Sequence, residues 1–177
     1  MNMWKKLSTK TVLEHPRLIV EEDEVEIAPG KTIQYLRYGY GGDGSVIIAL
    51  NENSEVLFIR EYSYVPGRML LQLPMGKIED GETPEVAGNR ELQEEAGYKA
   101  RSLVLKGTYY QNNRRSENKG YVVIASDLVS SNLKGDDEEI GIQRVWIPKK
   151  EIRKLIQSNE IVDADTLSSL MIADIIN

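Results

Sequence analysis

The sequence of 177 residues contains no cysteine and a single histidine. Without cysteine there is no disulfide, no thiol nucleophile and no zinc–thiolate site, and one histidine excludes most zinc-protease and histidine-relay schemes. Hydrophobic runs are also short: the longest, residues 46–50, is far below the roughly 20 residues that a membrane-spanning helix needs. The chemistry must therefore rest mainly on carboxylates, hydroxyls, amides, guanidinium groups or a bound cation.

Basic side chains are outnumbered, with 22 Lys and Arg against 28 Asp and Glu and a net charge of −6. Because a sequence-independent nucleic-acid binder needs a basic stripe, we predict no nucleic-acid partner. Residues 1–10 lack the apolar segment of a signal peptide, so no membrane partner and a cytoplasmic location are expected. A chain of this length suits one domain, or one domain with a small extension.

Alternating apolar residues predict an N-terminal hairpin over residues 17–27 and 32–40, with a turn at Pro29 and Gly30. The glycines at 39, 41, 42 and 44 are interpreted as a linker rather than a phosphate loop, because no Lys-Ser/Thr pair and no helix follow them. Strands are predicted at residues 45–50, 56–60, 103–110, 121–126 and 142–147, and helices at residues 83–96, from Pro148 and from about Asp165. This order indicates an α+β fold with a mixed or mostly antiparallel sheet flanked by helices.

The helix predicted over residues 83–96 carries an unusual charge pattern. Two sets of residues lie side by side on it, an apolar stripe of Gly88, Leu92 and Ala96 and an acidic arc of Glu91, Glu94 and Glu95. Like charges at these spacings destabilise a helix by about a few tenths of a kcal/mol per pair, and the helix dipole disfavours acids near its C-terminus. Arg90 can reach Glu94 one turn along, and a divalent cation would offset more of the repulsion. A solvated acidic face is the alternative.

The negative charge is concentrated in this part of the chain. Residues 76–98 contain seven acidic and two basic side chains, a net charge of −5 out of the total of −6. Oxygen-only ligands favour Mg²⁺ or Mn²⁺, and Mg²⁺ typically takes one or two carboxylates together with water and substrate phosphates. A cation held here would offset part of this local negative charge.

The same segment resembles the Nudix box, which reads Gly, five residues, Glu, seven residues, Arg-Glu-aliphatic-any-Glu-Glu-any-Gly-aliphatic. All of its strict positions are matched, by Gly76, Glu82, Arg90, Glu91, Glu94, Glu95 and Gly97. Leu92 fills the first aliphatic position, and Tyr98 at the second is a departure. The resemblance implies the Nudix fold, an α/β/α sandwich with a mixed central sheet, a catalytic helix at about residues 83–96 and an N-terminal antiparallel β extension.

The resemblance also implies roles for individual residues. Glu91 and Glu95 would be side-chain ligands of Mg²⁺, with Mn²⁺ as a second possibility, and the carbonyl of Met75 would be a further ligand. Glu94 would be another ligand or part of the base machinery, and Arg90 would orient the carboxylates. Glu117, the only acid in the loop of residues 110–119, is also a candidate catalytic residue as general base. The identity of the base and the number of metal ions stay open.

Residues 56–62 and 71–79 resemble the branch of ADP-ribose and nucleoside-diphosphate-sugar pyrophosphatases, although Ser63 and Gln72 stand where members commonly have Arg and Glu. By this resemblance residues 1–42 would form a β segment for dimerisation and base binding, and residues 43–177 the Nudix domain. The candidate substrate-binding residues are Trp4, Tyr35, Tyr38, Arg60, Arg114, Arg115 and Lys119. Ordinary strand packing is the alternative for the aromatic residues, and a solvated basic loop for residues 114–119.

Together these features imply a Mg²⁺-dependent pyrophosphohydrolase that acts as a homodimer on a small nucleotide. Its substrate would be a nucleoside diphosphate linked to another moiety, ADP-ribose or a nucleotide sugar, cleaved to nucleoside monophosphate and sugar phosphate. The alternatives are a nucleoside triphosphate or dinucleoside polyphosphate hydrolase of the same fold, and a module that binds ADP-ribose without cleaving it. The acidic residues 135–139 lack the ligand spacing of a Ca²⁺ loop and are predicted to form a solvated turn, and His15 is predicted to be structural.

Overall fold

The computed structural model describes residues 4–39, 42–133 and 141–176. It divides the chain into two compact units, one of Met1–Gly42 with Tyr110–Lys119, the other of Asp43–Tyr109 with Gly120–Asn177. The predicted turn at residues 135–139 and Gly41 of the glycine linker lie outside the described residues. Each unit has its own sheets and is described by itself.

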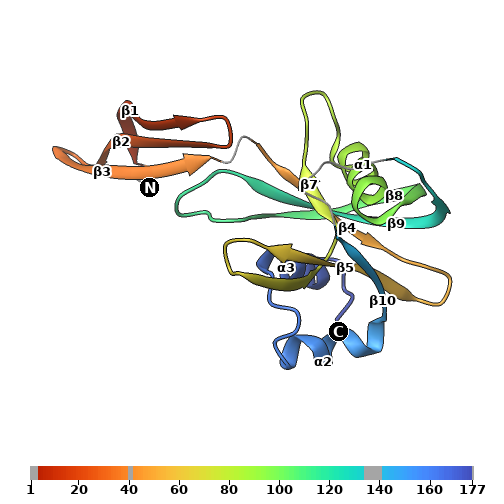
Figure 1. Cartoon of the computed structure of the whole chain (residues 1–177). Coiled ribbons are helices and arrows are strands. Elements are labelled where there is room, and N and C mark those ends of the chain that lie inside the picture. The colour runs from red at the N-terminus through yellow and green to blue at the C-terminus, as the bar shows by residue number, and fades with distance from the viewer. Residues whose placement is uncertain (1–3, 40–41, 134–140, 177) are drawn as a thin grey trace. The chain divides into compact units, whose positions relative to one another are not determined.

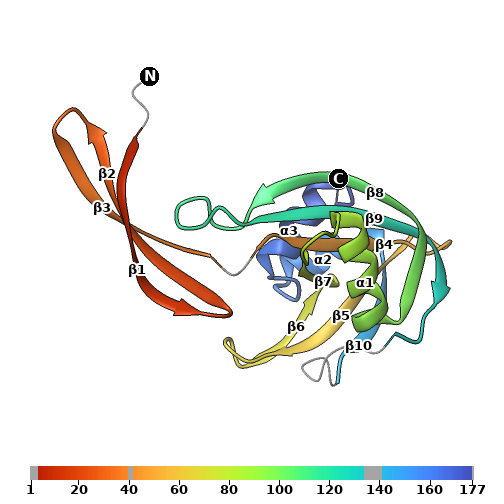
Figure 2. The same ribbon diagram turned by 90° about the horizontal axis from the view of Figure 1, so that it is seen from above.

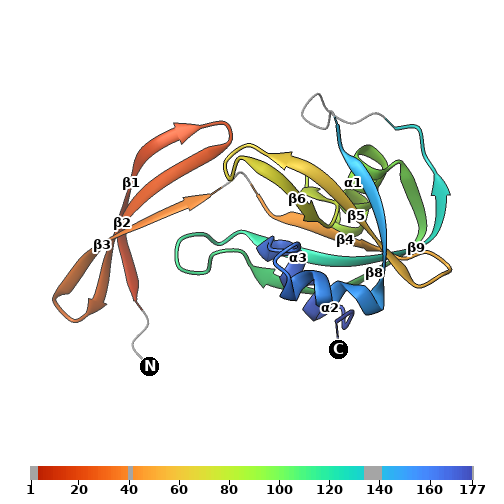
Figure 3. The ribbon, with the colours of Figure 1, turned by 60° about the horizontal axis from the view of Figure 1, so that its bottom comes forward.

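The first unit is built on a three-stranded antiparallel sheet in the order β1-β2-β3 (Figure 3). Its strands are β1 (Lys5–His15), β2 (Leu18–Ala28) and β3 (Lys31–Gly39). The hairpin of β2 and β3 confirms the prediction, with Gly30 at φ 73° in its turn. Strand β1 was not predicted from the sequence, because all of its residues are exposed and no alternation of burial marks it.

Cross-strand charge pairs hold this sheet together. The register places Lys5 of β1 opposite Glu26 of β2, and opposite charges at facing positions stabilise a strand pair. Asp23 is only 6% exposed, and its carboxylate is bonded at 2.7 Å by both the Thr9 hydroxyl and the Arg37 guanidinium. Burial alone would raise the pKa of Asp23, but these two donors outweigh it and lower the pKa below its usual value. The carboxylate is therefore held in its ionised form.

The second unit contains two sheets. One has the order β10-β5-β6 and the other the order β7-β4-β9-β8. The strands are β4 (Gly44–Ala49), β5 (Glu55–Ser63), β6 (Arg68–Gln72), β7 (Met75–Lys77), β8 (Tyr98–Tyr110), β9 (Lys119–Ser130) and β10 (Gln143–Pro148). Strands β4 and β9 are parallel, whereas β4 and β7 are antiparallel, so the predicted mixed sheet is confirmed. Figure 2 shows β8 and β9 running side by side at one edge.

In the part of the second unit that the structure describes, three helices cover the sheets from two sides. Helix α1 (Pro84–Ala96) lies on one side, and α2 (Lys149–Gln157) and α3 (Ala164–Ile172) lie on the other (Figure 1). The alternation of β4 explains the layers, because Ile47 packs in one core with Leu92 of α1, and Ile48 packs in a second core with Ile152 and Leu170. This is the predicted α/β/α arrangement. In the described part of the chain, no helix is long and apolar enough to cross a membrane.

Candidate active site

Helix α1 has strong start and stop signals at both ends. The Thr83 hydroxyl accepts a hydrogen bond from the N–H of Val86 at 3.3 Å, and Pro84 occupies the first turn, where no N–H is needed. Gly97 follows the helix with φ 66°, and its N–H donates to the carbonyl of Gln93 at 3.0 Å. These caps fix the register of the helix, and therefore which face the acidic residues occupy.

A glycine in α1 brings the helix close to β4. A Cβ atom on Gly88 would lie 2.8 Å from the Ser45 hydroxyl and 2.9 Å from Cγ1 of Ile47. The Ser45 hydroxyl also donates to the carbonyl of Pro84 at 2.8 Å, tying β4 to the start of the helix. The predicted apolar stripe is thus confirmed, and its small residues set the distance between the helix and the sheet.

Arg90 is the centre of a hydrogen-bonded carboxylate network, referred to below as the Arg90 cluster, made of Arg90, Glu82, Glu91 and Glu94. Its Nε and Nη2 donate to the two carboxylate oxygens of Glu82, both at 3.1 Å. Its Nη1 donates to Glu91 at 2.6 Å and to Glu94 at 3.0 Å, the latter being the contact that the sequence spacing predicts. Nη2 also donates to the carbonyl of Lys77 at 2.8 Å. One guanidinium group therefore faces three carboxylates, which leaves the cluster negative.

The hydrogen bonds between Arg90 and Glu82 keep this pair charged. The bond from Arg90 is the main cause that lowers the pKa of Glu82 below its ordinary value, in spite of burial. In turn, the bond to Glu82 is the largest of the effects that raise the pKa of Arg90. Glu82 was not predicted as a catalytic residue, although its strict position in the box was the signal that could have identified it as the partner of Arg90.

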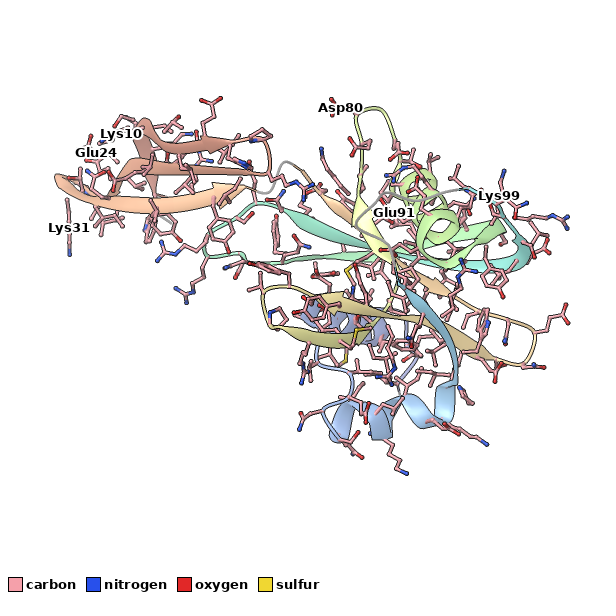
Figure 4. The ribbon with its side chains drawn as sticks, in the orientation of Figure 1. Lys10, Glu24, Lys31, Asp80, Glu91 and Lys99 are labelled. Carbon is pink, nitrogen blue, oxygen red and sulfur yellow. The ribbon has the colours of Figure 1, made fainter. Side chains whose placement is uncertain are left out.

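Glu91 and Glu95 lie against two successive residues of β7. The N–H of Met75 donates to Oε2 of Glu95 at 3.0 Å, and a Cβ atom on Gly76 would overlap the carboxyl group of Glu91. Both acids are largely buried, with exposed fractions of 8% for Glu91 and 9% for Glu95. Figure 4 shows Glu91 on α1, whereas Asp80 lies at the far tip of the loop between β7 and α1. Two carboxylates and the Met75–Gly76 backbone therefore meet at one place.

The chemistry of these donors fits a hard divalent cation. Glu91, Glu95 and the carbonyl of Met75 offer only oxygen ligands, which is what Mg²⁺ and Mn²⁺ prefer. Among the described residues no group of three His, Cys, Asp or Glu side chains is arranged to hold a metal by itself. A pair of carboxylates supplemented by a main-chain carbonyl suits Mg²⁺, which keeps several water ligands and binds substrate phosphates.

The close contact at Gly76 makes its replacement a direct test of the site. Changing Gly76 to Ala should weaken Mn²⁺ binding by about tenfold or more, because the new methyl group displaces the Glu91 carboxylate. Calorimetric titration with Mn²⁺ measures this effect. Changing Gly39 to Ala on β3 is the control, since its Cβ would meet no atom closer than 3.8 Å. Equal Mn²⁺ affinity of the two variants would contradict the placement of Glu91 in the cation site.

The first unit brings together four of the predicted substrate-binding residues. The loop Tyr110–Lys119 packs on β3, where the Tyr35 hydroxyl donates to the carbonyl of Arg114 and the Tyr38 N–H donates to that of Arg115 at 2.8 Å. The Arg115 guanidinium lies 5.2 Å from the centre of the Tyr35 ring and donates to the carbonyl of Leu36 at 2.9 Å. Aromatic and cationic groups are thus held side by side by main-chain hydrogen bonds that the sequence alone could not reveal.

The other predicted residues are distributed over both units. Trp4 packs edge-on against Tyr35, with 5.9 Å between ring centres, and Lys119 lies over the ring of Tyr110. Glu117 is exposed in the first unit, and Arg60, on β5 in the second, lies 3.7 Å from Glu160. The roles of Glu117 in catalysis and of Arg60 in substrate binding therefore stay predictions.

Comparison with known proteins agrees with this geometry. The NUDIX domain family matches residues 42–169. The chain is 26% identical over 145 residues to the ADP-ribose pyrophosphatase of Bacillus subtilis (strain 168), with 81% of this chain and 78% of that protein covered. It is 28% identical over 166 residues to the ADP compounds hydrolase NudE of Escherichia coli (strain K12), with coverages of 94% and 89%.

A solved structure extends the likeness to the fold. The crystal structure of an ADP compounds hydrolase superimposes with a TM-score of 0.90 and 25% identity, covering 98% of this chain and 94% of the other. The family match spans more than half of the chain and includes the whole of the Arg90 cluster. The chain therefore belongs to the Nudix family and is a hydrolase that acts on phosphoric anhydrides.

Proposed function

We propose that this Nudix hydrolase depends on Mg²⁺ and cleaves ADP-ribose or a nucleotide sugar to nucleoside monophosphate and sugar phosphate. The observation that carries the proposal is the meeting of Glu91 and Glu95, both nearly buried, with Met75 and Gly76 beside the Arg90 cluster. The names of two relatives, an ADP-ribose pyrophosphatase and an ADP compounds hydrolase, support a nucleoside diphosphate linked to a second group.

The residues of the chain would prepare the site in advance. Arg90 holds Glu91 and Glu94 by hydrogen bonds of 2.6 and 3.0 Å, and the Met75 N–H fixes one oxygen of Glu95. These carboxylates would hold the cation without having to reorganise, which is the main advantage of a preformed polar site. When bound, Mg²⁺ would neutralise diphosphate oxygens and make a coordinated water molecule more acidic.

Hydrolysis also needs a group that accepts the proton of the attacking water. Water attacks one phosphorus, the bridging bond from phosphorus to oxygen breaks, and the proton of the water passes to a carboxylate. Glu94 is one candidate, because its side chain is 20% exposed and is oriented by Arg90. Glu117 in the other unit is the second candidate. Their Gln variants, compared in a pH profile of kcat, distinguish the two.

The first unit would supply recognition of the nucleotide. Tyr35 and Tyr38 offer ring faces for a base, and Arg114 and Arg115 offer positive charge for phosphate or sugar hydroxyl groups. Because Arg115 also bonds to a main-chain carbonyl, it would be held in place before the substrate arrives. The expected homodimer and cytoplasmic location stay predictions.

A substrate panel with product identification tests the proposal. With Mg²⁺, ADP-ribose or a nucleotide sugar should be hydrolysed to nucleoside monophosphate and sugar phosphate, and EDTA should abolish turnover. Release of pyrophosphate from nucleoside triphosphates, with no turnover of ADP-ribose or nucleotide sugars, would support the alternative hydrolase instead. Binding of ADP-ribose without hydrolysis of any compound, with Mg²⁺ or Mn²⁺, would identify a binding module.

A further inference from the structure

The three residues before Gly76 are held by three different parts of the protein. They follow the end of β6 and lead into β7 at Met75. The N–H of Leu73 donates to the hydroxyl of Thr166 at 3.0 Å, and the carbonyl of Pro74 accepts from the N–H of Ile47 at 2.9 Å. The Met75 N–H donates to Glu95. Each of the three residues that lead to the Met75 carbonyl is therefore held by one hydrogen bond.

The contact with Thr166 is the most distant of these in sequence, and it is buried. Leu73 and Thr166 are 93 residues apart, and both are fully buried. Thr166 belongs to the first turn of α3, and its own N–H donates to the capping carboxylate of Asp163 at 2.7 Å. The Thr166 hydroxyl therefore belongs to a capped helix. It accepts the hydrogen bond of the Leu73 N–H, which lies between β6 and β7.

We propose that Thr166 is a positioning residue for the cation site. Its hydroxyl fixes the backbone at Leu73, and this in turn places Met75, whose N–H orients Glu95 and whose carbonyl is a predicted ligand. Mg²⁺ demands near-ideal ligand positions, so a small shift of this segment weakens binding. The inference rests on the proposed function, but it adds a residue on α3 that lies outside the Nudix box.

Three variants separate this role from a purely structural one. Thr166→Val keeps the shape of the side chain but removes the acceptor, so the buried Leu73 N–H must move to find another partner. Thr166→Ser restores the hydroxyl. Ser169→Ala is the matched control, because it removes a second fully buried hydroxyl of α3, one that interacts with Tyr109 rather than with Leu73.

The measurements are the Kd for Mn²⁺ alone on the full chain, by electron paramagnetic resonance, and the Mn²⁺ concentration for half-maximal activity. Thr166→Val should raise both by about tenfold or more, whereas Thr166→Ser and Ser169→Ala should stay close to the unmodified protein. Unchanged Mn²⁺ affinity in a folded Thr166→Val variant would overturn the inference. If the unmodified protein bound no Mn²⁺, the proposed function itself would fail.

A measurement on the unmodified protein covers the case in which Thr166→Val does not fold. Coupling between two sites is reciprocal, so a cation that depends on the Leu73–Thr166 bond must also stabilise it. Added Mg²⁺ should slow hydrogen exchange of the Leu73 amide by about fivefold or more relative to the core amide of Leu57. Equal slowing of the two amides would overturn the inference.

Discussion

Replacing Glu95 by Gln should lower kcat by about a hundredfold or more while the fold is retained. Gln keeps the size of the side chain and an oxygen that can accept the 3.0 Å bond from the Met75 N–H. It lacks the negative charge with which Glu95 would hold a cation in a place where only 9% of the residue is exposed. Steady-state kinetics with a saturating substrate over a range of Mg²⁺ concentrations measure the loss, and circular dichroism checks the fold.

Asp80→Asn is the matched control for this experiment. It removes the same charge from an exposed position at the tip of the β7–α1 loop (Figure 4). Because water and salt screen an exposed charge, kcat should change by less than about twofold. If Glu95→Gln were as active as Asp80→Asn, Glu95 could not be a ligand of the catalytic cation.

Replacing Arg90 by Met should lower the free energy of unfolding by about 2–3 kcal/mol in the absence of divalent cations. The variant leaves Glu82, Glu91 and Glu94 facing one another without the guanidinium group that bonds to all three. The expected loss is smaller than for a fully buried ion pair, because the Arg90 side chain is 28% exposed. Added Mg²⁺ should recover part of the loss, since a bound cation stabilises the folded state. Urea unfolding with and without Mg²⁺ measures both effects.

Arg101→Met provides the comparison for Arg90. Arg101 pairs with Asp127 at 3.8 Å, and both side chains are more than half exposed, so the free energy of unfolding should change by less than about 0.5 kcal/mol. Mg²⁺ should stabilise this variant and the unmodified protein equally. An Arg90→Met protein as stable as Arg101→Met, with or without Mg²⁺, would show that the three carboxylates do not need the Arg90 guanidinium group.

The part of the site that could be predicted from sequence is the part built from neighbours along the chain. The contact between Arg90 and Glu94 follows from one helical turn, and the ends of α1 follow from Thr83 and Gly97, whose capping roles depend on local backbone geometry. The alternation of β4 between two cores is likewise a consequence of strand geometry. These features depend only on residues a few positions apart, so a short stretch of sequence is enough to predict them.

Contacts between distant segments could not be predicted in this way. The bond from Leu73 to Thr166 spans 93 residues, and that from Tyr35 to Arg114 spans 79, so no periodicity indicates them. Strand β1 escaped prediction for a related reason. Its stabilising partners are acids such as Glu26 on the next strand, and a charge pair is visible only once the register is known.

The assignment of the loop Tyr110–Lys119 to the first unit has a consequence for dissecting the protein. The chain passes between the units three times, near residues 42, 110 and 119, rather than once through a linker. A fragment that begins at Asp43 would deprive the Arg115 carbonyl of the Tyr38 N–H and the Asn112 amide of the Tyr38 hydroxyl. An excised catalytic domain would therefore need this loop shortened or redesigned, because the two units do not divide at a single position in the sequence.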